Sequence, residues 1–170
     1  PVAGVLLIGI IMLLINPFVA AINTGLNNFL FSLSGVNKII LGAILAGMMS
    51  VDLGGPVNKA AYTFGTGMLA EGHYEIMAAV MIGGMVAPLA IALIATFFPK
   101  KLPKKERQAG LLNYVMGLSF ISEGAIPFAS ADPLRVLPSC VVGSAVSGAM
   151  SMAFNCTLMA PHGGIFVLPL

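Results

Sequence analysis

The sequence predicts an all-α, polytopic helical membrane protein, and three observations support that class. Of the 170 residues, 58% are hydrophobic and only 8% are charged, whereas a soluble domain carries about a quarter charged residues. Residues 76–98 contain no charge and exceed the roughly 20 apolar residues that span a bilayer. The other apolar runs are short and interrupted by Gly and Pro, which predicts broken helices and re-entrant hairpin-like segments.

The first two segments are predicted to be helical. Residues 2–15 are apolar and run into Asn16-Pro17. Proline removes a backbone donor and restricts the residue before it, so we expect a bend there. In residues 25–37, apolar side chains recur at helical spacing among Asn and Ser. This pattern is typical of an amphipathic helix that lies at the membrane interface or bridges two parts of a bundle.

A first polar interruption, residues 50–59, separates the short apolar runs 39–49 and 60–70. Neither run is long enough to span a membrane alone. Together they predict either one broken helix or the two limbs of a re-entrant hairpin. Both arrangements require that protein or a cavity cover the exposed backbone.

Three polar side chains of this interruption are candidates for ligand contact. Asp52 and Lys59 flank Gly54-Gly55-Pro56, where they either neutralise each other or face a ligand. Asn58 offers both hydrogen-bond donors and an acceptor in the same loop.

Five basic residues crowd into the short loop after the 76–98 span: Lys100, Lys101, Lys104, Lys105 and Arg107. Basic residues in short loops mark the cytoplasmic side, so this loop is predicted to be inside and residues 71–75 outside. No aromatic residue interleaves with these charges, and nucleic acid binding is therefore not expected. His73, with Glu71 and Glu75 at the outer end, is interpreted as part of a solvated cap and not as a metal site.

The second interruption contains Glu123, which follows the short run 110–122 and has Gly and Pro neighbours that open the helix. A carboxylate in hydrocarbon costs at least ~2.5 kcal/mol, so such residues usually face a bundle interior or a watery cavity. Short segments broken by Gly or Pro point to a substrate site near the membrane midplane. As a carboxylate, Glu123 only accepts hydrogen bonds, which suits a neutral, hydroxylated ligand. A structural ion pair is the alternative.

Asp132 and Pro133 predict a helix start, with Asp132 as the N-cap and Pro133 at the first helical position. Arg135 could pair with Asp132 or with Glu123. Its guanidinium could also hold the adjacent hydroxyls of a sugar, or a phosphate.

The last part of the chain predicts one span that begins near Leu134 and an irregular return. Small residues four positions apart in this span, Gly143 with Ser147 and Ser144 with Gly148, favour close helix packing. In the third interruption, residues 155–164, His162 precedes a Gly pair and either reaches a cavity or is a satisfied buried histidine. Cys140 and Cys156 lie in apolar surroundings and are interpreted as inert thiols.

Common catalytic templates are absent from the sequence. It contains no HExxH motif, no GxxxxGK[ST] phosphate loop and no GxGxxG fingerprint. A dyad of Ser119 or Ser122 with His162 lacks the nucleophile elbow of a serine hydrolase. We therefore expect no catalytic residue, metal or cofactor within the chain.

Three motifs in order carry a family resemblance: DLGGPVNKAAY at 52–62, SEGAIPFASADPLR at 122–135 and APHGGIF at 160–166. With them the chain strongly resembles, over essentially its whole length, the membrane (IIC) component of fructose-specific bacterial phosphotransferase systems. The departures are mild, because many relatives are expected to have Thr at Ser122 and Ala at Ser130. Serine keeps the hydroxyl of threonine.

The resemblance implies a carrier that takes fructose from outside and presents it to a cytoplasmic IIB domain, which phosphorylates it during uptake. Glu123 would bind a sugar hydroxyl near the phosphorylation point, and His162 and the 52–59 loop would complete the pocket. The candidate sugar-binding residues are Glu123, His162, Asp52, Asn58, Lys59, Ser122 and Arg135, with Asp132 as a helix cap or ion-pair partner.

The resemblance also implies that residues 1–170 form a single transmembrane transport domain, the later portion of a longer IIC domain. We expect a multi-pass protein of the bacterial cytoplasmic membrane, a homodimer, and IIB and IIA phosphocarrier domains as partners. An ion-coupled secondary sugar transporter, with Glu123 or Asp52 as its proton site, is one alternative. A non-transporting structural membrane subunit is another.

Overall fold

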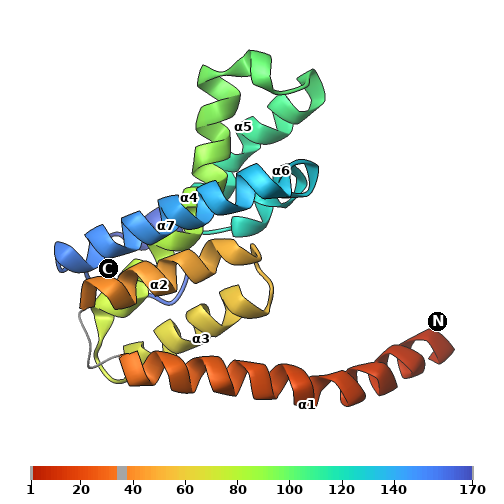
Figure 1. Cartoon of the computed structure of the whole chain (residues 1–170), viewed down its shortest axis with the longest axis vertical. Helices are drawn as coiled ribbons and strands as arrows, with labels where there is room; N and C mark the ends of the chain where they lie inside the picture. The colour runs from red at the N-terminus through yellow and green to blue at the C-terminus, as the bar shows by residue number, and fades with distance from the viewer. Residues whose placement is uncertain (1, 34–37, 170) are drawn as a thin grey trace.

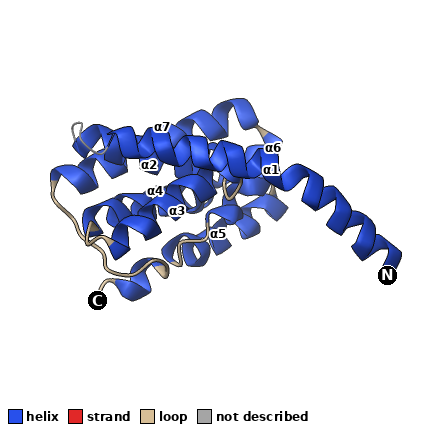
Figure 2. Cartoon of the chain, turned by 90° about the horizontal axis from the view of Figure 1, so that it is seen from below, coloured by secondary structure: helices blue, strands red, loops and turns tan. Residues whose placement is uncertain are grey.

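The computed structural model describes residues 2–33 and 38–169, and the regular elements within these ranges are all helical (Figure 2). The α-helices are α1 Val2–Leu33, α2 Lys38–Val51, α3 Pro56–Ala70, α4 Tyr74–Phe97, α5 Lys104–Leu118, α6 Ile126–Ala131 and α7 Pro133–Ala153. Short 3-10 helices are η1 Pro99–Lys101, η2 Ser122–Ala125 and η3 Gly164–Val167. The predicted all-α class with broken helices is confirmed.

Two of the described helices are long and apolar enough to cross a membrane. Helix α4 has 24 residues and α7 has 21, which at about 1.5 Å per residue covers the roughly 30 Å hydrocarbon core. They match the two spans predicted from the sequence. Helix α4 runs through the centre of the fold and contacts α2, α3, α5 and α7 (Figure 1).

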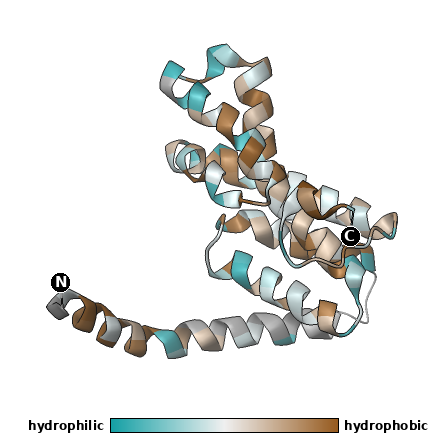
Figure 3. Ribbon diagram, turned by 180° about the vertical axis from the view of Figure 1, so that it is seen from behind, coloured by the Kyte–Doolittle hydropathy of each residue, from teal (hydrophilic) through white to brown (hydrophobic). Residues whose placement is uncertain are grey.

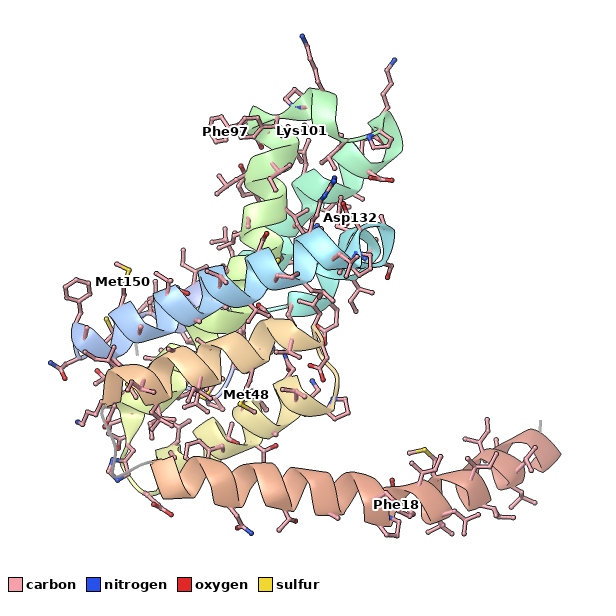
Figure 4. The ribbon with its side chains drawn as sticks, in the orientation of Figure 1. Phe18, Met48, Phe97, Lys101, Asp132 and Met150 are labelled. Atoms are coloured by element: carbon pink, nitrogen blue, oxygen red, sulfur yellow. The ribbon has the colours of Figure 1, made fainter. Side chains whose placement is uncertain are left out.

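Helix α1 continues through Pro17 and curves away from the rest of the chain (Figures 1 and 2). Its second half lies along α3, while its first half projects, apolar and without cover (Figure 3). There Leu13 is 73% exposed and Phe18 is 76% exposed (Figure 4). The predicted segment 25–37 belongs to the same helix as far as Leu33, and residues 34–37 lie outside the described residues.

Helices α2 and α3 form a hairpin, which is one of the two arrangements predicted for this part of the chain (Figure 1). They have 14 and 15 residues, or about 21–23 Å each, which is less than a bilayer core. Pro56 occupies the first turn of α3, where the missing N–H costs nothing.

Small residues allow α2, α4 and α7 to pack closely. A Cβ atom on Gly83 of α4 would lie 2.5 Å from the Cα of Ala46 in α2, and one on Gly148 of α7 would collide with the Ala46 Cβ. At the same contact, the Ser144 hydroxyl lies 2.6 Å from that of Ser50 and donates to the Gly83 carbonyl at 2.8 Å. Ser144 and Gly148 therefore lie where close helix packing was predicted.

Helices α4 and α5 extend beyond the other helices as an arm, and the basic loop forms its tip (Figures 1 and 3). Lys101 and the exposed Phe97 lie there (Figure 4). The Lys101 Nζ atom lies 5.9 Å from the centroid of the Phe98 ring. The loop is thus a projecting end of the fold, and its cytoplasmic side remains a prediction.

Candidate functional site

Three irregular segments, residues 52–55, 119–125 and 154–164, interrupt the helical fold where the sequence predicted breaks. Each contains one non-glycine residue with a positive φ: 47° at Leu53, 64° at Phe120 and 51° at Asn155. This conformation is unfavourable for bulky side chains, and residues that adopt it are enriched at functional sites.

Close contacts bring these segments together. Gly54 has φ +112°, and a Cβ atom there would lie 2.7 Å from Oε1 of Glu123. Gly164 has φ +58°, and a Cβ atom there would collide with the carbonyl oxygen of Leu118 at the end of α5 and lie 2.9 Å from the N atom of Phe120 in the second segment. The first and third segments therefore both meet the second, and only glycine fits at these two contacts.

A cavity of about 320 Å³ lies beside this meeting point, between the second and third segments and the first turns of α3 that follow the first segment. That volume is within the range of about 300–1,000 Å³ for small-molecule sites. The cavity is lined by Met49 of α2; Asn58, Lys59 and Tyr62 of α3; Phe120 and Ile121; Ser122 and Glu123 of η2; and His162. Five of the seven predicted sugar-binding residues are thus brought together.

The cavity carries one acidic and one basic side chain, Glu123 and Lys59, and both residues are exposed. The ion pairs within 4 Å among the described residues involve neither of them. Their charges are opposite, so the lining as a whole favours a neutral ligand over a strongly charged one. The carboxylate can only accept and the ammonium can only donate hydrogen bonds.

Asn58 is held in one orientation at the edge of the cavity. Its residue is 3% exposed, and its Nδ2 atom donates to the carbonyl of Met49 at 2.7 Å. Ser122, 5% exposed, begins the 3-10 turn that carries Glu123. Asn58 and Ser122 are thus buried at the cavity, whereas Lys59 and Glu123 are exposed.

Asp52 is not among the residues that line the cavity. Its Oδ2 accepts a hydrogen bond from the Val57 N–H at 2.7 Å, and its Oδ1 accepts one from the Asn58 N–H at 2.9 Å. These donors belong to the first turn of α3, where a carboxylate satisfies free N–H groups and complements the helix dipole. Asp52 therefore positions Asn58, and none of the ion pairs found among the described residues joins it to Lys59.

Arg135 is not brought to the cavity. Its side chain is 89% exposed, and Nη1 lies 3.6 Å from Oδ2 of Asp132. Asp132 stands at the N-cap of α7, directly before Pro133, but its side chain makes no capping hydrogen bond. The ion-pair interpretation of Asp132 fits this geometry, at the junction of α6 and α7 (Figure 4).

Four cavity residues were missed by the sequence reasoning: Met49, Tyr62, Phe120 and Ile121. One signal could have found Tyr62, because residues four apart share a helix face and Tyr62 follows Asn58 by four. The sequence gives no signal for the left-handed backbone conformation that places Phe120 at the cavity.

Two other cavities have different chemistry. One of about 460 Å³ lies between α4, α7 and the C-terminal segment, and no charged residue lines it. Another of about 250 Å³ lies at the turn between α3 and α4. There Oε1 of Glu75 lies 3.5 Å from Nζ of Lys38 and 3.7 Å from Nδ1 of His73. The polar side chains of this cavity therefore pair with one another. The 320 Å³ cavity has the donors and acceptors best suited to a hydroxylated ligand.

Helices of membrane-spanning length, packed against shorter helices that end beside a polar cavity, are typical of membrane transporters. Comparison with known families narrows this class. The family described as phosphotransferase system, EIIC, matches residues 2–143. The chain therefore belongs to the phosphotransferase EIIC family.

Curated relatives match nearly all of the chain. It is 51% identical to the PTS system fructose-specific EIIABC component of Bacillus subtilis, over 98% of the chain and 26% of that protein. It is 52% identical to the fructose permease IIC component of Bacillus amyloliquefaciens, over 98% of the chain and 55% of the relative. The PTS system fructose-specific EIIB'BC component of Escherichia coli is 52% identical over 99% of the chain and 30% of its own length.

The chain thus spans about half of the length of the permease and between a quarter and a third of the two larger relatives. No solved structure shows significant similarity to it.

Proposed function

We propose that the chain forms the sugar-binding part of a phosphotransferase permease, a multi-pass protein of the bacterial cytoplasmic membrane that takes up fructose. The sugar would be presented to a cytoplasmic IIB domain and phosphorylated during uptake. The cavity at the meeting of the three breaks, with Glu123 and Lys59 facing it, is the observation that carries this proposal. The names of the relatives, which are fructose-specific, support the choice of sugar.

Sugar hydroxyls both donate and accept hydrogen bonds, and the cavity offers partners for both. In the proposal, Glu123 accepts from one hydroxyl and Lys59 donates to another. Asn58, Ser122 and His162 complete the contacts around the ring. Asp52 acts indirectly, by holding the first turn of α3.

Phosphorylation would also favour release of the product. A phosphate group adds about −1.5 to −2 charge at pH 7, which Glu123 repels at the site where the neutral sugar had bound. The phosphorylated sugar would then leave toward the cytoplasm and could not return through lipid.

Relatives named EIIB'BC and EIIABC support IIB as the donor domain, and in this proposal IIA phosphorylates IIB in turn. The functional unit is proposed to be a homodimer. The projecting apolar half of α1 is then a surface available to lipid or to the second subunit.

The test uses the full-length protein that contains this chain, purified into lipid nanodiscs. Fructose binding is measured by calorimetry, and fructose phosphorylation is measured with phosphorylated IIB. Glu123→Gln should weaken binding about ten- to a hundredfold, because a hydrogen bond to a charged group is lost. Glu71→Gln, an exposed glutamate outside this cavity, should change neither measurement.

Fructose binding and phosphorylation that are the same in Glu123→Gln as in the wild type would overturn the proposal. Uptake into vesicles that lack a phosphoryl donor, together with its collapse under an uncoupler, would instead indicate an ion-coupled transporter. A protein that binds no sugar would indicate a structural subunit.

A further inference from the structure

Three aromatic rings from separate segments meet at the 320 Å³ cavity: Tyr62 of α3, Phe120 of the second break and His162 of the third. The centroids of Phe120 and His162 are 5.2 Å apart, those of Tyr62 and Phe120 are 6.2 Å apart, and those of Tyr62 and His162 are 6.3 Å apart. All three distances are typical of interacting aromatic pairs, about 4.5–7 Å. The Tyr62 and Phe120 rings are inclined by 35° to each other, whereas the His162 ring stands at 85° to Tyr62 and 57° to Phe120. The rings therefore form one continuous aromatic cluster beside the polar groups.

The backbone and its neighbours fix the ring of Phe120. Phe120 has φ +64°, a left-handed conformation two residues after the end of α5. Behind the ring, Gly84 of α4 leaves a notch, because a Cβ atom on Gly84 would lie 2.5 Å from Cε2 of Phe120. An unfavourable backbone conformation and a glycine thus combine to place this ring at the cavity.

A cyclic sugar has a rim of hydroxyl groups and faces made of C–H groups. The face of an aromatic ring is electron-rich and attracts the weakly positive C–H hydrogens, while the contact also buries apolar surface. In this cavity Glu123, Lys59 and Asn58 supply hydrogen bonds to a rim, and the Tyr62 and Phe120 rings supply a surface for a face.

We infer that Tyr62 and Phe120, whose rings are inclined by 35° to each other, form a stacking platform that receives the C–H face of a cyclic sugar, with His162 edge-on beside them. The inference rests on the proposed sugar-binding function and deepens it. Such a platform favours ring forms of hexoses over acyclic polyols with the same hydroxyl groups. A purely structural role for Phe120, which is 6% exposed, is the competing account.

Saturation-transfer NMR on the full-length protein tests the contact directly. The protein is deuterated except at Phe, Tyr and His, its aromatic protons are saturated, and fructose is the ligand. Saturation should reach the C–H protons of one sugar face more strongly than those of the other. Equal transfer to both faces, or none, would overturn the platform.

Substitutions provide the second test. Phe120→Leu and Tyr62→Leu should each weaken fructose binding about three- to tenfold, which corresponds to the usual contribution of an aromatic contact. Gly84→Ala should also weaken it, because the added methyl group displaces the Phe120 ring without altering a polar group. The matched control is Phe128→Leu, since Phe128 is likewise 6% exposed but does not line this cavity.

The outcomes separate this inference from the proposed function. A wild-type protein without fructose binding contradicts both. Binding that is lost in Glu123→Gln but kept in Phe120→Leu, Tyr62→Leu and Gly84→Ala overturns the platform alone. Equal losses in Phe128→Leu and Phe120→Leu would assign Phe120 to general packing and also overturn it.

Discussion

At the scale of single residues, Asp52 and Glu123 show how two carboxylates near one cavity acquire different tasks. The Asp52 oxygens are occupied by backbone N–H groups of α3. Glu123 is itself exposed, lies beside Gly54 on the η2 turn and faces the cavity. The difference arises from the backbone around each acid, since both side chains carry the same chemical group.

Asp52→Ala should lower the free energy of unfolding by about 1 kcal/mol, the usual cost of a lost helix cap, and up to about 2 kcal/mol. The first turn of α3 should fray because two N–H groups lose their acceptor. Thermal unfolding of the protein in nanodiscs measures the loss. Hydrogen exchange of residues 57–60 locates it.

Asp132→Ala is the control for this substitution. Asp132 also precedes a helix that starts with proline, but it makes no capping hydrogen bond and pairs only with the exposed Arg135. Its removal should cost less than about 0.5 kcal/mol. Equal destabilisation by the two substitutions would contradict the capping role of Asp52.

At the scale of elements, the α2–α3 hairpin consists of helices that are each too short to cross a bilayer. Its position depends on close contact of α2 with α4 and α7. Glycine, alanine and serine make that approach possible at Gly83, Ala46 and Ser144. The hairpin then carries Asn58 and Lys59 to the cavity.

Gly148→Ala should destabilise the protein by about 1–3 kcal/mol, the typical cost of overpacking. Its new methyl group would strike Ala46 at the crossing of α2 and α7. Gly67→Ala in α3 is the matched control, because nothing lies within 4 Å of its Cβ position. This change should stabilise α3 by about 0.5–1 kcal/mol, since alanine favours a helix.

Melting temperatures of the two variants in the same nanodiscs provide the comparison. Opposite signs support the close crossing of α2 and α7. A Gly148→Ala protein as stable as the wild type would contradict the close contact between α2 and α7.

At the scale of the whole molecule, the site exists only after folding, because its parts are far apart in the sequence. Residues 52–62, 119–125 and 162–164 come together through the packing of α2, α3, α4 and α7. Broken helices within a membrane require that protein cover their free backbone groups or that these groups line a cavity.

Much of this arrangement could be predicted from the sequence. The long apolar spans, the three breaks and the charged residues within them are visible in composition and in the positions of Gly and Pro. Glu123 and Lys59 could be singled out because charges are rare in such a chain. His162 was a candidate because a glycine pair follows it.

The remaining features depend on directions in space that composition does not encode. Arg135 and Asp52 are charged, as Lys59 and Glu123 of the cavity are. However, Arg135 faces outward, and Asp52 caps the first turn of α3. In the sequence, Phe120 cannot be distinguished from an ordinary core residue, because its left-handed backbone conformation is visible only in the structure. The single helix α1 through Pro17 shows that one missing hydrogen bond bends a helix without ending it.

In the proposed site, three breaks jointly surround one sugar. Hydrogen–deuterium exchange of the full-length protein in nanodiscs, with and without saturating fructose, tests this most directly. Fructose should slow exchange together in residues 52–59, 119–125 and 160–164 and leave the 71–75 turn and the 99–104 loop unchanged. Protection of one break alone, or protection confined to the turn or the loop, would contradict the claim.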